Sequence, residues 1–249
     1  MSFKGETRKN HPAHFISDET EVHLWICRFQ SEANATEECY EEIISADERK
    51  RADRFRFNEE RSKFIQARGV LRTVLGKYLN LRPNELVFDY NKYGKPGLQA
   101  RINPRNVKFN LSHSRSLAIY AVTKDREVGV DVEYLRDVKR ADKIIERFFS
   151  QHEREFYGSR PSAIKKLAFF QLWTRKEAYT KAMGAGISLP RDDYTLSLIP
   201  GDSSYRNNRS PVTGNNRKWS LYDIEIDENY KAALAVEGEG HDIRYFSLI

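Results

Sequence analysis

Asp131 and Glu133 are the residues whose types and spacing most directly suggest chemistry in this sequence. They lie in the segment 127–133, EVGVDVE, in which valines alternate with glycine and acids. This period of two predicts a β-strand with the valines on one face and both carboxylates on the other. Neighbouring acids repel each other unless a cation or a proton lies between them, and carboxylate oxygens suit Mg²⁺. A solvated strand face carrying two ordinary acids is the alternative.

A second group of polar residues falls on a predicted helix over Ser162–Met183. Trp173, Glu177 and Lys181 are spaced four residues apart and therefore share one helix face. Because the helix is apolar over a wide arc, burial would partly desolvate the acid and the base and favour a bound ligand. A simple Glu–Lys helix pair, worth about 0.3–0.5 kcal/mol, is the alternative. Together with the two strand acids, Glu177 completes a set of three carboxylates that could bind Mg²⁺ and leave positions for phosphate oxygens.

The remaining pattern predicts an α+β chain in which a strand, helices and further strands occur twice. Ser45 and Glu48 form a capping box, which predicts a helix start. The expected strands are 21–29, 86–90, 107–112, 117–123, 127–133, 194–199, 219–226, 231–237 and 243–248. The expected helices are 46–57, 59–79, 141–149, 151–157 and 162–183. We expect a loose N-terminal tail (1–18), an N-terminal half (19–126) and a C-terminal half that carries the acids (127–249).

The composition of the 249-residue chain indicates a folded globule, with 39% hydrophobic and 12% aromatic residues. No apolar run approaches the length that spans a bilayer, and the first residues lack the apolar core of a secretory signal. The two cysteines, Cys27 and Cys39, have no metal-ligand spacing. So sparse a pair favours a reducing compartment, and the cytoplasm is the expected location.

Positive charge is concentrated between residues 47 and 82, where eleven Lys/Arg stand against five Asp/Glu in a chain of net charge +6. Such a field favours an anionic partner, namely a phosphate compound, a nucleic acid or an acidic protein. A solvated basic helix face is the commoner alternative. The basic residues of the helix 59–79 are expected to lie mostly off its apolar stripe; they are Arg61, Lys63, Arg68 and Arg72.

Four separated features occur in order between about residues 45 and 190. They are the arginine-rich segment 47–72, YGKP at 93–96, FNLSHS at 109–114, and GVDVE followed by W-x-x-K-E-A-x-x-K at 129–181. Together they resemble the 4′-phosphopantetheinyl transferases of the Sfp type. The resemblance implies transfer of the phosphopantetheine arm of coenzyme A to a carrier-protein serine, with release of 3′,5′-ADP. It also implies two similar α/β halves related by a pseudo-two-fold axis, with coenzyme A in the cleft between them.

The resemblance assigns roles to the acids and the lysine already singled out. Asp131, Glu133 and Glu177 match the Mg²⁺-binding acids of the family, which makes Asp131 and Glu177 catalytic candidates. The metal would hold the diphosphate and neutralise charge. Glu177 is also the best candidate for taking the serine proton, directly or through a metal-bound water. Lys181 matches the lysine that contacts phosphate and stabilises developing charge.

The resemblance also places coenzyme A against further residues. His113 matches a histidine that binds a coenzyme A phosphate, the 3′-phosphate of the ribose, and Ser112 precedes it in the same motif; a structural turn residue is the alternative for His113. Lys95, in the YGKP turn, would contact the nucleotide end, unless it is a solvated turn lysine. Arg51 falls at a basic phosphate contact, and Lys63 is a second candidate for it.

The implied partner is an acyl or peptidyl carrier protein from fatty-acid, polyketide or non-ribosomal peptide synthesis. No nucleic-acid or membrane partner is expected, and an internal pseudo-dimer favours a monomer. The sequence departs from the family pattern at Glu48, where some members carry a lysine. Two other functions are open from the residues: a basic nucleic-acid-binding protein without catalysis, and another Mg²⁺-dependent phosphotransferase or phosphodiesterase that uses the three carboxylates.

Overall fold

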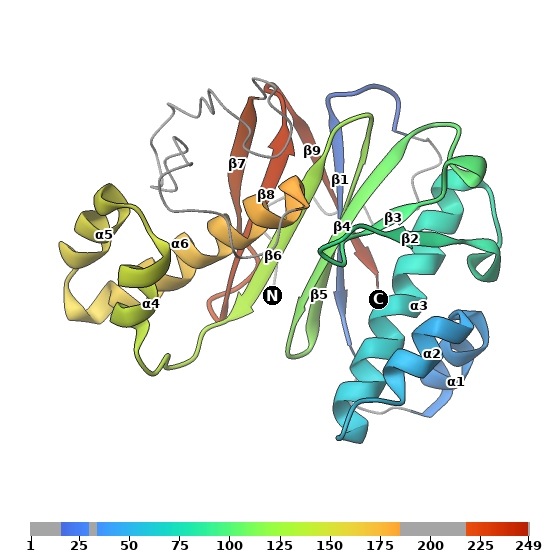
Figure 1. Cartoon of the computed structure of the whole chain (residues 1–249), viewed down its shortest axis with the longest axis horizontal. Helices are drawn as coiled ribbons and strands as arrows, with labels where there is room; N and C mark the ends of the chain where they lie inside the picture. The colour runs from blue at the N-terminus through green and yellow to red at the C-terminus, as the bar shows by residue number, and fades with distance from the viewer. Residues whose placement is uncertain (1–15, 30–33, 185–217, 249) are drawn as a thin grey trace.

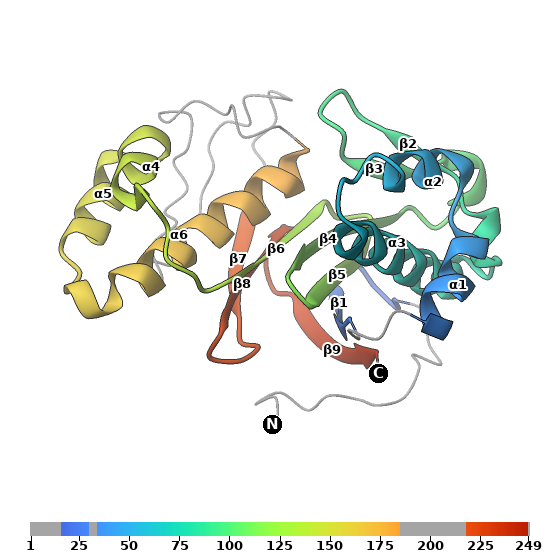
Figure 2. The same ribbon diagram turned by 90° about the horizontal axis from the view of Figure 1, so that it is seen from below.

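The structure is a computed structural model that describes residues 16–29, 34–184 and 218–248. It has mixed α+β architecture, which confirms the predicted fold class. Two sheets lie at the centre, with helices α1–α3 on one side and α4–α6 on the other (Figures 1 and 2). Of the predicted tail 1–18, only residues 16–18 are described, and the predicted strand 194–199 lies outside the described residues.

The first part of the chain supplies three strands of a four-stranded sheet, whose order is β4-β5-β1-β9; the edge strand β9 comes from the end of the chain. Helix α3 packs on one face of this sheet through Leu71, Val74 and Leu75. The elements are β1 (Glu21–Arg28), α1 (Asn34–Ile43), α2 (Ala46–Ala52), α3 (Asn58–Leu79), β2 (Phe88–Tyr90), β3 (Pro96–Leu98), β4 (Val107–Ser114) and β5 (Leu117–Lys124). Strands β2 and β3 form a separate hairpin, and short 3₁₀ helices cover Pro83–Glu85 and Ala100–Ile102.

The second part forms a three-stranded sheet with strand order β6-β8-β7, crossed by the long helix α6 (Figure 1). Its elements are β6 (Val128–Tyr134), α4 (Ala141–Phe148), α5 (Gln151–Gly158), α6 (Ser162–Met183), β7 (Trp219–Ile224), β8 (Tyr230–Glu237) and β9 (Asp242–Leu248). The pairing repeats that of the first sheet, because β6 pairs with β8 as β1 pairs with β5. The last strand, β9, instead joins the first sheet and runs parallel to β1. The two-fold axis itself remains a prediction.

The two sheets pack face to face, so the order of layers is helix, sheet, sheet, helix. The valines of β6 lie in the core between the sheets, as the period-two pattern predicts. Strand β1 is buried on both faces from Glu21 through Cys27. Its two faces meet different layers: Trp25 packs toward α3, and Leu24 packs toward the second sheet. No helix within the described ranges is both long enough and apolar enough to cross a bilayer.

Candidate active site

The three predicted metal-binding acids lie between strand β6 and helix α6. Asp131 and Glu133 project from β6 on the face opposite the valines, and Glu177 lies on α6, which packs against that strand. Burial and the charge of Asp131 raise the pKa of the Glu133 carboxyl. Burial and the same charge also raise the pKa of Glu177, and Glu133 raises it further. The charge of Asp131 therefore acts on both other carboxylates across the interface between strand and helix.

Gly129 explains how the helix comes close to these acids. It occupies the position two residues before Asp131 on the same strand face. A Cβ atom at Gly129 would lie 2.0 Å from the Ala178 carbonyl oxygen and 2.3 Å from the Ala182 nitrogen. Only glycine permits this approach, and the approach brings Lys181 within reach of the strand. The Lys181 amine donates hydrogen bonds to Asp131 Oδ1 at 2.6 Å and to the Val130 carbonyl at 3.3 Å.

Asp131 has one oxygen that is well paired and one that is not. Its Oδ1 accepts hydrogen bonds from Lys181 and from Ser112 Oγ at 3.0 Å. Its Oδ2 is buried and has no hydrogen-bond partner. A buried unpaired carboxylate oxygen is costly, and a cation would satisfy it. Within the described segments, no group of three or more His, Cys, Asp or Glu side chains is arranged so that it could hold a metal ion. The chemistry of the donor set nevertheless fits Mg²⁺, because Asp131, Glu133 and Glu177 offer carboxylate oxygens and Asp131 Oδ2 lacks a partner.

A cavity of about 440 Å³ opens beside these acids and brings five predicted site residues together. They come from the end of α2, the turn between β2 and β3, strand β4 and helix α6. The five are Arg51, Lys95, His113, Glu177 and Lys181. The aromatic side chains of Phe55, Phe64, Tyr90 and Tyr93 complete much of the wall. The cavity is therefore cationic along much of its wall, apolar in places and acidic at one edge.

The predicted phosphate-binding residues differ in their position relative to this cavity. The His113 ring is open to it, and desolvation by the surrounding walls lowers the pKa of the imidazole, as do the charges of Lys181 and Lys63. Arg51 places its guanidinium 5.4 Å from the centre of the Phe64 ring. Lys63 forms an ion pair with Glu59 and does not line the cavity. Ser112 lies on the opposite face of β4 from His113, where it contacts Asp131 and Lys181.

Comparison with known proteins decides the family. A family model described as "4'-phosphopantetheinyl transferase superfamily" matches residues 127–235, and one described as "4'-phosphopantetheinyl transferase, N-terminal" matches residues 33–125. The 4′-phosphopantetheinyl transferase HetI of Nostoc sp. is 38% identical over 231 residues, which is 93% of each chain. This chain belongs to the 4′-phosphopantetheinyl transferase family. It is therefore an enzyme of the transferase class, and the resemblance inferred from its motifs is confirmed. The transferase is also 28% identical to Sfp of Bacillus subtilis over 156 residues, which is 63% of this chain and 67% of Sfp.

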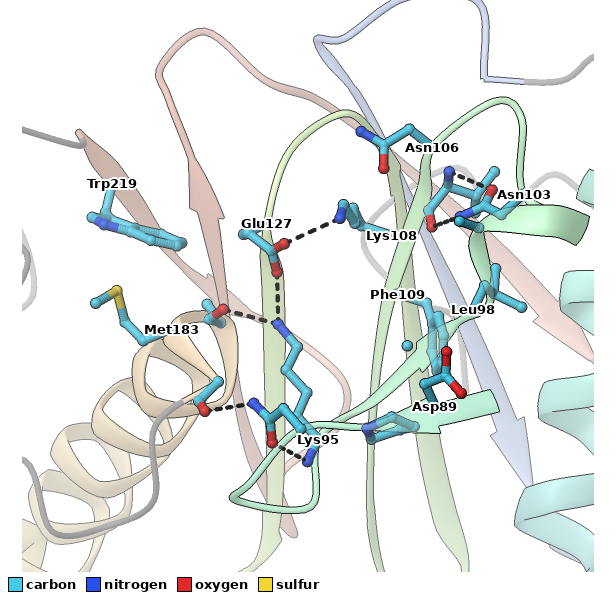
Figure 3. Close-up of a pocket in the computed structure, with 17 residues that line it drawn as sticks. Asp89, Lys95, Leu98, Asn103, Asn106, Lys108, Phe109, Glu127, Met183 and Trp219 are labelled. Carbon is cyan, nitrogen blue, oxygen red and sulfur yellow. Dashed lines mark hydrogen bonds and ion pairs between the residues drawn. The ribbon is translucent and has the colours of Figure 1, made fainter. Parts of the chain in front are cut away.

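Lys95 has a position in the transferase that the sequence did not predict. Its amine donates hydrogen bonds to Glu127 Oε2 and to the Ala182 carbonyl, both at 2.9 Å (Figure 3). Glu127 also lies 3.4 Å from the amine of Lys108. This group lines a second cavity, of about 580 Å³, on the other side of the turn. Lys95 therefore joins the β2–β3 turn to the start of β6 and the end of α6, while its nucleotide contact remains a prediction.

Arg68 is a cavity residue of the transferase that the sequence analysis missed. The prediction placed Arg68 and Arg72 mostly off the apolar stripe, but both are buried. Each pairs with Glu48, which is 2% exposed; Arg68 Nε donates to Glu48 Oε1 at 2.5 Å, and Arg72 Nε donates to Oε2 at 2.7 Å. Part of the basic charge of this segment is thus neutralised inside the protein, which weakens the case for a nucleic-acid surface. The sequence signal that could have indicated this pairing was the capping box, because it places the Glu48 carboxylate at the start of α2.

Proposed function

We propose that this transferase moves the 4′-phosphopantetheine arm of coenzyme A to a serine of an apo acyl or peptidyl carrier protein in a Mg²⁺-dependent reaction. The observation that carries the proposal is that the 440 Å³ cavity reaches Glu177 and Lys181, and that Lys181 is paired with Asp131. Cationic residues line one part of the cavity, and Glu177 and Lys181 line another. Coenzyme A carries a 3′-phosphate and a diphosphate. The 3′-phosphate would face the cationic residues, and the diphosphate would face Lys181 and the metal-binding acids.

In this reaction the serine oxygen attacks the phosphorus that bears the pantetheine arm, and the bond to the bridging oxygen breaks. The arm becomes a phosphodiester of the serine, and 3′,5′-ADP leaves. Bound Mg²⁺ would neutralise the diphosphate and stabilise the leaving group, with Asp131, Glu133 and Glu177 as its ligands. Lys181, whose amine already lies among these acids, would stabilise charge that develops on the phosphate.

The proposal gives Glu177 a second role, which is to accept the proton of the attacking serine. Glu177 lines the cavity beside Lys181 and would take this proton directly or through a metal-bound water. His113 and Arg51 would hold the 3′-phosphate of coenzyme A, since both line the cavity. We expect the chain to act as a monomer in the cytoplasm, where its free cysteines, buried Cys27 and exposed Cys39, would remain reduced.

A direct assay tests this function. Purified protein is mixed with coenzyme A, Mg²⁺ and several apo carrier proteins, and the carriers are weighed by mass spectrometry. We expect the added mass of phosphopantetheine, and we expect Asp131→Asn to abolish it while leaving the circular dichroism spectrum unchanged. Asp137→Asn, the same substitution at a carboxylate that is 97% exposed, is the matched control and should retain transfer. No added mass on any carrier would contradict the proposal, and so would near-normal transfer by Asp131→Asn.

A further inference from the structure

Three side chains of strand β4 accept hydrogen bonds from the backbone of strand β6. The three side chains are two residues apart along β4, and the three N–H groups that donate to them are two residues apart along β6. The pairs are Asn110 Oδ1 with the N–H of Val130 at 3.0 Å, Ser112 Oγ with that of Val132 at 3.3 Å, and Ser114 Oγ with that of Tyr134 at 3.0 Å. We call this contact the β4–β6 seam.

The seam supplies hydrogen-bond acceptors to backbone N–H groups at the edge of a sheet. Strand β4 is an edge of the first sheet, and β6 is an edge of the second. Alternate N–H groups of β6 point away from its partner β8, and in the buried interior they need acceptors. Side-chain oxygens of β4 take the place of the carbonyl groups that a neighbouring strand would supply. The two sheets are thereby held in one register along β6.

Two of the three seam residues also contact the metal-binding acids. Ser112 Oγ lies 3.0 Å from Asp131 Oδ1, and Ser114 Oγ lies 3.4 Å from Glu133 Oε2. In each case the hydroxyl accepts an N–H bond from one residue of β6 and donates its proton to the acid that precedes that residue. The hydroxyl oxygen turns a lone pair toward the N–H group. Its single proton therefore points away from that group and toward the carboxylate.

The third pair provides an internal comparison. Asn110 accepts the N–H bond of Val130, but the preceding residue is Gly129, which has no side chain. Asn110 therefore supports the seam without contacting an acid of β6. Within the seam, a hydroxyl therefore contacts a carboxylate at two places, Asp131 and Glu133.

We propose that Ser114 is a positioning residue that aims Glu133 at the metal, as Ser112 does for Asp131; this rests on the proposed function. Glu133 needs such support because its side chain is 23% exposed and lies 3.9 Å from the guanidinium of exposed Arg136. Without the Ser114 hydroxyl, the carboxylate is free to turn toward Arg136. Groups that orient metal ligands in this way typically contribute about 10- to 100-fold to metal affinity.

The test measures metal binding directly, without substrate. Mn²⁺ is titrated into the intact protein without coenzyme A, and free Mn²⁺ is followed by electron paramagnetic resonance. We expect Ser114→Ala to raise the Kd for Mn²⁺ about 10-fold. Ser114→Thr keeps the oxygen and should bind like the unchanged protein. Asn110→Ala loses one seam bond and should lower the melting temperature, while its Kd for Mn²⁺ changes less than about 2-fold, since it contacts no acid of β6.

The outcomes separate this inference from the proposed function. Equal Mn²⁺ affinity of Ser114→Ala and the unchanged protein, with normal carrier modification, would overturn the positioning role alone. Equal losses in Ser114→Ala and Asn110→Ala would also overturn it, because they would show a general effect of the seam. If the unchanged protein binds no Mn²⁺, both the inference and the metal site fail; carrier modification in the mass assay then shows whether transfer itself stands.

Discussion

Lys181 Nζ lies 2.6 Å from Asp131 Oδ1, and this ion pair links the end of helix α6 to the middle of strand β6. Asp131 is 4% exposed, so Lys181 and Ser112 supply the polar contacts that stabilise its carboxylate when no cation is bound. We expect a double-mutant cycle of Lys181→Met and Asp131→Asn to give a coupling energy of about 1–3 kcal/mol in urea unfolding without Mg²⁺. Saturating Mg²⁺ should reduce the coupling, because the cation then compensates Asp131.

A second ion pair on the same helix provides the control for that cycle. Lys166 lies 3.0 Å from Asp137, but the two side chains are 50% and 97% exposed. Pairs in water contribute little, so the cycle of Lys166→Met and Asp137→Asn should give less than about 1 kcal/mol, with no response to Mg²⁺. A Lys181–Asp131 coupling no larger than this one would show that the buried pair does not hold α6 against β6.

We expect His113 to make coenzyme A binding depend on pH. Desolvation in the cavity and the charges of Lys181 and Lys63 lower its pKa below the usual value of about 6.5. A bound phosphate would favour the protonated ring and raise that pKa, so the complex holds more protons than the free protein between the two values. Coenzyme A affinity should therefore rise as the pH falls through this window.

Calorimetry in two buffers with different ionisation enthalpies measures the proton uptake that accompanies binding. His113→Ala should remove the part of the uptake that belongs to the ring and weaken coenzyme A binding about 10-fold, the loss expected for a hydrogen bond to a charged group. The ligand's own phosphates titrate in the same way with both proteins. His152→Ala, an exposed change on α5, should behave as the unchanged protein does. Equal proton uptake by His113→Ala and the unchanged protein would rule out the phosphate contact.

Local patterns were sufficient to predict most of the fold. The period of two identified β6, and the apolar arc with Gly184 at its end identified α6 over Ser162–Met183, as the structure has it. Helix α1 was missed because its sequence, NATEECYEEI, is acidic and has few large apolar residues. The burial of both faces of β1 could not be predicted, since it depends on packing between distant elements; nor could its pairing with β9, which joins residues more than 200 positions apart.

The candidate site was predictable where its residues share an element, and less so where distant elements meet. The spacing of Glu177 and Lys181 along one helix and the alternation of the β6 acids were visible in the sequence. The pairing of Arg68 with Glu48 joins two helices, and the bonds of Lys95 join three elements. Side-chain charge in a sequence suggests solvent exposure, whereas the structure shows that these charges are satisfied inside the protein.

Lys95 is expected to act mainly on the position of α6. Burial lowers the pKa of its amine, and the amine holds the Ala182 carbonyl near the end of the helix. Lys95→Met should lower the free energy of unfolding by about 1–3 kcal/mol, because it leaves the partly buried Glu127 with a weaker partner. Thermal unfolding without coenzyme A measures the effect. If Lys95 instead contacts only the nucleotide, the variant will keep its stability and lose coenzyme A affinity.

The neighbouring Lys92 is a matched control for Lys95. It lies in the same turn, is exposed, and has its amine 4.9 Å from the centre of the Tyr93 ring. Lys92→Met removes a charge of the same sign from the same loop, so a general electrostatic effect of the turn would appear in both variants. We expect Lys92→Met to change the free energy of unfolding by less than about 0.5 kcal/mol, as is usual for surface substitutions.

Gly129 should be the most restrictive position of the strand that carries the acids. Its added Cβ would lie 2.0 Å from the Ala178 carbonyl oxygen, and both belong to backbones that are packed in the core. Gly129→Ala must therefore push α6 away from β6, and we expect a loss of more than about 3 kcal/mol, as for severe overpacking. Gly158→Ala, at the end of α5 with no atom within 4 Å of its added Cβ, should instead be neutral or stabilising by up to about 1 kcal/mol. Urea unfolding of both variants tests the pair. Where Gly129→Ala remains folded, its Mn²⁺ affinity should fall as well, because Glu177 moves with the helix; full stability together with full Mn²⁺ affinity would show that the close approach of α6 is not required for the site.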